Sequence, residues 1–201
     1  MEDKSDIEIL KEFAKSTNRS IEVKELLYPR TGFGTTQKYK RMVYIPNNSE
    51  KTSFFVWFND PYSTIGQTTI FSGAFIPLSS KVRTSLRIRN RYTLDKLNLF
   101  TQLKDNKIGN SHFDSRVVIS GNLDIATKRI LSSSKVQKQI LRAMEIESYF
   151  HISINHFNIE FVPELNEKSS IAIINHQGWE VDKTNIESMF DRIEKIRELI
   201  N

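Results

Sequence analysis

Basic residues recur at every second position in one short segment of the chain. These residues are Lys81, Arg83, Arg87, Arg89 and Arg91, and the even positions from 82 to 88 hold valine, threonine, leucine and isoleucine. Alternate residues of a β-strand point to the same face of the sheet. The spacing therefore predicts a strand over 82–90 with a solvent-accessible cationic ladder on one face. Arginine side chains pair well with phosphates and carboxylates, so this ladder is the candidate ligand-binding site.

A purely structural role explains the same ladder. Charged residues often cover a solvated sheet face or protect an edge strand from aggregation. Nucleic-acid binding usually needs several aromatic side chains among the basic residues, and this segment has only Tyr92. We therefore favour the structural interpretation. If four arginines did contact phosphates, log affinity would fall against log salt with a slope of about −3 to −4. Serine in place of all four arginines would then abolish binding and leave thermal unfolding nearly unchanged. The four residues are Arg83, Arg87, Arg89 and Arg91.

No other set of residues predicts a catalytic or metal site. The absence of cysteine excludes disulfides, thiolate nucleophiles and cysteine-ligated metals. Ser111, His112 and Asp114 have the residue types of a hydrolase triad, but sequence neighbours seldom converge in that way, so a loop entering a strand is expected. Gly32-Phe33-Gly34 lacks a third glycine and predicts a turn. The histidines are expected to be solvated, without a metal or cofactor: His112, His151, His156 and His176.

The first half of the chain predicts one helix followed by strands. Ser5 and Glu8 form a capping box before apolar residues at helical spacing, which indicates a helix over about 6–16. Segments rich in β-branched and aromatic residues then predict strands over 21–27, 39–45, 52–58, 67–71 and 82–90. Residues 54–58 are apolar at every position, which is typical of a central strand covered on both faces.

The second half predicts a mixture of elements. The pattern indicates a short helix over 94–100, a strand over 116–120 and a strand over 171–174. Asn122 is expected to cap a helix that ends at Leu131, and Ser134 to cap another that ends at about Met144. The fold class is α+β, mostly antiparallel sheet with an N-terminal helix, two short central helices and a packed C-terminal helix. We expect a single domain over 1–201, and the break near 101–111 is the best candidate for a subdomain boundary.

A β-hairpin is predicted over 150–161, with Asn155-His156 as a two-residue turn. This register opposes the apolar pairs Ile154 with Phe157, Ile152 with Ile159, and Phe150 with Phe161. The intervening pairs are polar: Ser153 with Asn158, and His151 with Glu160. One register thus separates apolar from polar residues completely, and a slip by one residue would destroy the separation.

The end of the chain predicts an amphipathic helix over about 185–200. Thr184 and Glu187 have the spacing of a capping box. The apolar residues that follow recur every three or four positions: Ile186, Met189, Phe190, Ile193, Ile196 and Ile200. Burial of all six would contribute about 9–18 kcal/mol at most, so we expect core packing. Docking onto a partner or a second copy is the alternative.

Composition sets limits on function. The chain has 201 residues and a formal charge of +5, and residues 26–100 alone hold 11 basic and 3 acidic residues. The longest apolar run is far too short for a membrane helix, and the N-terminus is polar, so we expect a cytoplasmic protein. The preferred hypothesis is a non-catalytic interaction module for a protein partner or for self-association. Nucleic-acid or phosphate-ligand binding through the basic ladder is the alternative.

Residues 113–162 resemble the soluble region of a bacterial family of unknown function. The resemblance rests on the order Phe113-Asp114-x-x-Val117-x-Ile119, a helix ending at Ile130-Leu131, a second short helix and a β-hairpin. Many members of that family carry membrane helices before this region, and this chain has none in its sequence. The resemblance implies a bacterial, non-enzymatic domain and no catalytic residues.

Overall fold

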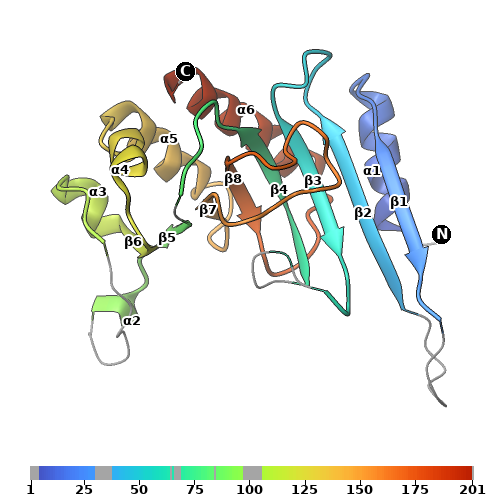
Figure 1. Ribbon diagram of the computed structural model, residues 1–201, viewed down its shortest axis with the longest axis horizontal. Helices are drawn as coiled ribbons and strands as arrows, with labels where there is room; N and C mark the ends of the chain where they lie inside the picture. The colour runs from blue at the N-terminus through green and yellow to red at the C-terminus, as the bar shows by residue number, and fades with distance from the viewer. Residues whose placement is uncertain are drawn as a thin grey trace.

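The computed structural model describes residues 5–29, 38–63, 65, 69–83, 85–96 and 106–200. Within them, eight antiparallel strands form one sheet in the order β1-β2-β3-β4-β8-β7-β5-β6 (Figure 1). Helices lie at both ends of the chain and between the strands, so the α+β class is confirmed. Strands β5 and β6, from either side of residues 101–111, pair directly with each other. Residues 101–105 and Gly32-Phe33-Gly34 lie outside the described part.

The element bounds follow most of the predicted segments. The strands are β1 Glu22–Leu27, β2 Tyr39–Pro46, β3 Phe54–Asn59, β4 Ile70–Pro77, β5 Leu86–Asn90, β6 Val117–Gly121, β7 His151–Ile154 and β8 Ser170–Asn175. The helices are α1 Asp6–Ser16, α2 Thr93–Lys96, α3 Ser111–Arg116, α4 Ile125–Leu131, α5 Ser134–Ala143 and α6 Lys183–Ile200. None of the described helices is long and apolar enough to cross a lipid bilayer.

Helices cover one face of the sheet, which we call the helix face. Figure 1 shows α1, α6 and α5 on this side. The buried face of α1 contributes Leu10 and Phe13, and the helix begins with the predicted capping box of Ser5 and Glu8. Helix α6 packs against β3, β4, β8 and α5. Side chains such as Phe55 and Trp57 of β3 complete this core.

An irregular segment, residues 155–169, covers the central strands on the opposite face, which we call the open face (Figure 1). Its Phe157 packs 4.7 Å from the ring of Phe71, and its Phe161 stacks on Phe58 at 6.1 Å between ring centroids. The segment therefore forms a second apolar core with the outward residues of β3 and β4. Strand β3 is buried on both faces, as its unbroken apolar run predicts.

The predicted hairpin over 150–161 is wrong. β7 ends at Ile154, and Ile152 lies in the helix-face core whereas Ile159 lies in the open-face core. β7 pairs with β5 on one side and β8 on the other, so it has no free edge for a returning strand. Asn155 does adopt the positive φ expected of a turn, 50°, but there the chain turns across the sheet.

The bounds of β4 and β5 differ most from the prediction. β4 continues through Gly73 to Pro77, although glycine and proline indicated a break there. β5 begins at Leu86, because Val82 belongs to a different network: its amide donates to Ser169 Oγ, and its carbonyl accepts from Asn155. Pairing with β8 accounts for the longer β4, and the contacts with Ser169 and Asn155, which are distant in the sequence, account for the shorter β5.

Gly73 is required by close packing of the backbone, which gives a stability prediction. A Cβ at this position would lie 2.2 Å from the carbonyl oxygen of Ile173 on β8. We expect Gly73→Ala to lower the free energy of unfolding by about 1–3 kcal/mol, measured by urea denaturation. Gly178→Ala is the matched control, because no atom lies within 4 Å of its added Cβ. An equal loss of unfolding free energy in both variants would contradict the role of close packing at Gly73.

Several helix ends also differ from the prediction. Ser111 to Arg116 form helix α3 instead of a loop, because Asn110 accepts hydrogen bonds from the first free amides. Asp182 accepts the amide of Asn185, so α6 begins before Thr184. Helix α4 is capped by Asp124 instead of the predicted Asn122, and α5 is capped by Ser133 instead of the predicted Ser134. Neighbouring polar residues therefore compete for each cap, and the tertiary structure selects one.

Candidate functional site

Only two of the five basic residues of the predicted cationic ladder lie within a strand. Lys81 and Arg83 precede β5, and Arg87 and Arg89 are the two ladder residues inside the strand. Arg87 lies opposite Ser153 of β7, and Arg89 opposite Val118 of β6, both on the open face. The alternation holds from Leu86 to Arg89, but the expectation of one strand with five solvent-accessible basic residues is wrong.

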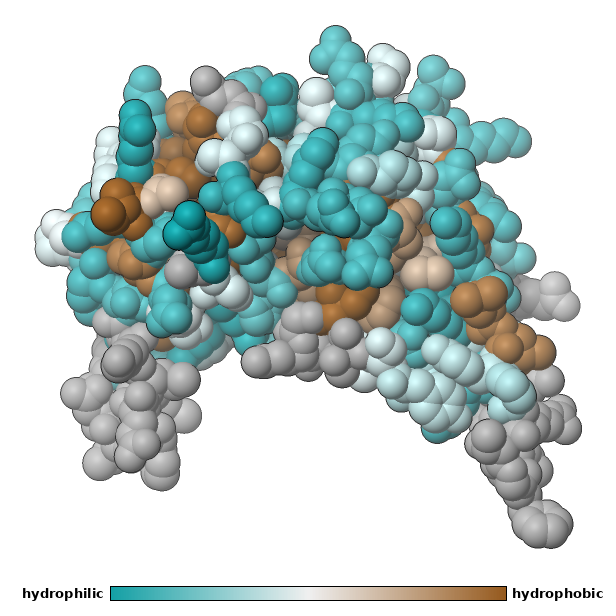
Figure 2. All heavy atoms as spheres, viewed as in Figure 1, coloured by the Kyte–Doolittle hydropathy of each residue, from teal (hydrophilic) through white to brown (hydrophobic). Residues whose placement is uncertain are grey.

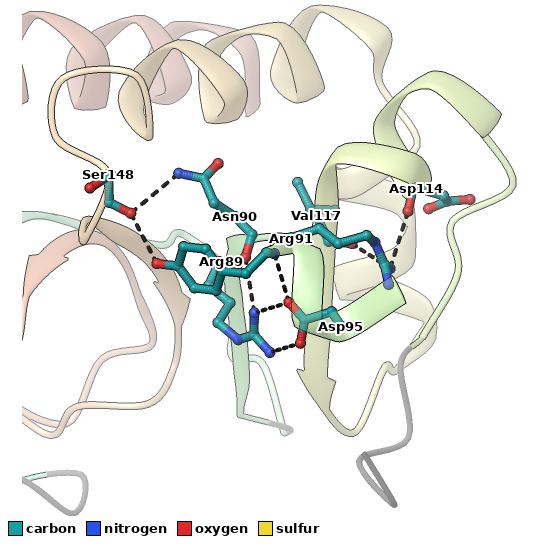
Figure 3. Close-up of polar contacts among 8 residues, drawn as sticks. Arg89, Asn90, Arg91, Asp95, Asp114, Val117 and Ser148 are labelled. Carbon is teal, nitrogen blue, oxygen red and sulfur yellow. Dashed lines mark hydrogen bonds and ion pairs between the residues drawn. The ribbon is translucent and has the colours of Figure 1, made fainter. Parts of the chain in front are cut away.

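Arg89 and Arg91 are used inside the fold (Figure 3). The two terminal nitrogens of Arg89 each donate to one oxygen of Asp95 at 2.7 Å. Hydrogen bonds from this guanidinium hold the pKa of the Asp95 carboxyl at about 2. Arg91 donates to the carbonyl oxygens of Val117, at 2.7 Å, and Asp114, at 3.3 Å. These two arginines join the end of β5 to α2 and to the start of β6.

The role of Arg89 and Arg91 changes one expectation. Serine at all four arginines would leave the partly buried Asp95 without its counter-ion and would free two backbone carbonyls. We therefore expect such a variant to lose stability as well as any ligand binding. A test of the site needs a single substitution at a residue that the fold does not use in this way.

Arg87 is such a residue, because it has no counter-ion among the described residues. Its Nη2 lies 3.1 Å from Nε2 of His176, and its buried Nε has no hydrogen-bond partner. Burial, and then the charge of Arg89, lower the pKa of the half-buried Arg87 guanidinium. A half-buried cation without a counter-ion raises the free energy of the folded state. An anionic ligand that pairs with it would offset this cost.

Two histidines extend from Arg87 into the protein. Nδ1 of His176 lies 3.1 Å from Nδ1 of His151, and His151 is only 2% exposed. Burial, followed by the charge of Arg87, lowers the pKa of His151 to about 2, and burial also lowers the pKa of His176. Both rings are therefore neutral near pH 7. The predicted solvated His151 opposite Glu160 is wrong.

Tautomers decide the direction of the hydrogen bonds in the neutral pair. The guanidinium of Arg87 can only donate, and its Nη2 lies 3.1 Å from Nε2 and 3.4 Å from Nδ1 of His176. If Arg87 donates to Nε2 of His176, then Nδ1 of His176 carries the proton and donates to Nδ1 of His151. The chain of rings thus orients one guanidinium without neutralising it. Arg87 comes from β5, His151 from β7, and His176 from the residue after β8. No sequence spacing connects these three residues.

The other candidate groups are separate. The carboxylate of Asp114 accepts the amides of Ile108 and Gly109, so it does not orient His112 as a triad would require. Nδ1 of His156 lies 2.8 Å from the Ser85 hydroxyl. In the described part of the chain, no group of three or more histidine or acidic residues could hold a metal ion.

The chain was compared with protein-family models, curated proteins and solved structures. No match was found. The resemblance of residues 113–162 to a bacterial family therefore stays a prediction. Two of its features differ in the structure: Phe113 and Asp114 lie in helix α3, and the segment after Ile154 is not a hairpin strand.

Proposed function

We propose that the protein is a non-catalytic binding module that takes an oxyanion of its partner, a carboxylate or a phosphate group, at Arg87. The observation that carries this proposal is a half-buried guanidinium without a carboxylate partner among the described residues. The favoured partner is a protein, or a second copy of this chain, that presents an acidic side chain. The proposal includes a cytoplasmic location.

The geometry supports one anionic group rather than a long polyanion at this site. Arg89 is already neutralised by Asp95, and Arg91 is bound to backbone carbonyls. The neutral state of both histidines leaves Arg87 as the charge that an incoming anion would meet. An arginine fork binds carboxylate and phosphate with two parallel hydrogen bonds, which suits either ion.

The site can be tested with inorganic phosphate and citrate as probes. A ligand at about ten times its Kd stabilises the folded state by about 1.4 kcal/mol, or a rise of about 3–5 °C in Tm for a chain of this size. We expect this rise for the wild type, at matched ionic strength in NaCl, and its loss in Arg87→Gln. Arg83→Gln, an exposed residue before β5, is the control. An unchanged rise in Arg87→Gln would contradict the proposal.

A second measurement separates a binding role from a structural role. Arg87 is half-buried and has no counter-ion within the described ranges. Replacing it with an apolar side chain of similar length therefore removes the free-energy cost of desolvating the charge. We expect Arg87→Met to keep or raise the free energy of unfolding, by up to about 1 kcal/mol, while phosphate binding is lost. A loss of 2 kcal/mol or more (roughly the penalty for breaking a needed buried contact) would assign Arg87 to the fold instead.

A further inference from the structure

A second basic surface lies on the helical pair α4–α5, away from Arg87. Residues 125–144 contain five basic and no acidic residues. All five are exposed, and none forms an ion pair with a described residue: Lys128, Arg129, Lys135, Lys138 and Arg142. Helices α3, α4 and α5 lie together at the end of the molecule that carries β5 and β6 (Figure 1).

Three of these residues form a stripe along α5. Lys135, Lys138 and Arg142 are three and four positions apart, so they lie on one side of the helix. The opposite side buries apolar residues such as Val136 and Ile140. Like charges at these spacings destabilise a helix by a few tenths of a kcal/mol per pair. Packing of the fold does not require the stripe, and its repulsion would be relieved by a polyanion.

A cavity of about 380 Å³ lies beside the stripe, between α3 and α5. Lys138 and Arg142 line it together with Arg116, whose charge is compensated by Glu145 at 3.0 Å. Phe113 and Leu141 provide apolar lining. Figure 2 shows apolar side chains among hydrophilic ones at the end of the molecule that carries these helices. The cavity volume falls within the range of small-ligand sites.

Polar amides complete the lining of this cavity. The side chain of Asn110 donates to Oε1 of Gln137 at 2.6 Å, which joins the start of α3 to α5. A ligand here would meet apolar carbon, amide groups, the ion pair of Arg116 and Glu145, and two cations that have no carboxylate partner among the residues that the structure describes. A nucleotide combines these chemistries, because its base is flat and largely apolar with polar edges, and its phosphate is anionic.

We propose that the α5 stripe and this cavity bind single-stranded nucleic acid, with backbone phosphates on the stripe and a base in the cavity. A single strand is favoured over a duplex because its bases can leave the stack and enter a cavity. The exposed cations of α4, Lys128 and Arg129, extend the positive surface. The site uses no residue of the Arg87 cluster, so this proposal goes beyond the proposed function and does not depend on it.

Fluorescence anisotropy with labelled oligo(dT) and oligo(rU) of about 20 nucleotides tests the proposal. We expect a Kd of about 1–100 μM at low salt and a log–log salt slope of about −3.5 for five phosphate contacts. The triple variant Lys135→Gln, Lys138→Gln and Arg142→Gln should bind at least about tenfold more weakly, with a slope smaller by about 2. Its Tm should be equal or higher, because like-charge repulsion is removed.

A control with the same change of charge is available on the other side of the molecule. Lys11→Gln, Lys15→Gln and Lys24→Gln remove three exposed cations from α1 and β1, and should leave the affinity within about twofold. Arg87→Gln should also leave it unchanged. Undiminished binding by the α5 variant would overturn the proposal. So would tighter binding to a duplex of the same length, or binding to phosphatidylserine vesicles without binding to either oligonucleotide.

Discussion

A chain that ends at Asp182, without α6, should not fold. Five apolar side chains of α6 are buried against the sheet and α5: Ile186, Met189, Phe190, Ile193 and Ile196. Their burial contributes about 7–15 kcal/mol as an upper estimate, which is as large as the net stability of an ordinary domain. We expect the truncated chain to be insoluble, or to have far-UV circular dichroism without a cooperative thermal transition.

Single substitutions make the same prediction quantitative. Phe190→Ala should lower the free energy of unfolding by about 3–5 kcal/mol, because a buried aromatic side chain is removed. Leu199→Ala is the control on the same helix, since Leu199 is 37% exposed, and should cost less than about 1 kcal/mol. A truncated chain that remains folded and monomeric would show that α6 serves a partner interface instead.

Acid should destabilise the protein before its carboxylates are protonated. The pKa of His151 is about 2 in the folded state, against about 6.5 in the unfolded state. Between these values the unfolded chain binds more protons, so stability is complete above about pH 6.5 and is lost as pH falls. His151 alone should lower the free energy of unfolding by about 2 kcal/mol between pH 7 and pH 5. His176, whose pKa is also lowered, acts in the same direction.

Urea denaturation at several pH values between about 5 and 7 measures this effect. His151→Asn keeps a hydrogen-bonding group for His176 and cannot be protonated in this range. Its free energy of unfolding should therefore fall less between pH 7 and pH 5, by about the contribution of His151. His112→Asn, at an exposed position of α3, should follow the wild type. Parallel curves for wild type and His151→Asn would contradict the assignment. Side-chain NMR should show no titration of His151 above about pH 5.

The helices show what local sequence can predict. Ser5 and Glu8 begin α1 as predicted, and the apolar residues of α6 are buried at the predicted spacing, with Ile200 less buried at the end. Glu187 of α6, however, pairs with Arg19, which lies between α1 and β1. It therefore does not complete a capping box with Thr184. Periodicity thus predicts the buried face of a helix better than the partner of each polar residue.

The candidate sites show a different limit. The alternation of basic and apolar residues placed Arg87 and Arg89 on one face of β5, as predicted. It could not separate Arg89, which pairs with Asp95, from Arg87, which has no acidic partner in the described part of the chain. The basic excess over 26–100 also gives no indication of the basic residues in 125–144. A balanced total for the second half of the chain concealed this uniformly basic segment. A shorter window of about 20 residues would have found it.

Local sequence is enough to predict the α+β class, the buried central strand β3, and the helices α1, α5 and α6. These features depend on the spacing of apolar side chains along one segment, and burial of apolar surface dominates the energy of folding. Tertiary structure alone decided that β7 lies between β5 and β8, and that residues 155–169 cross the open face. That choice buries His151 beside His176, and among the described residues Arg87 has no counter-ion. The pairing of strands far apart in the chain is decided by which edges and apolar faces remain free, and no local pattern contains that information.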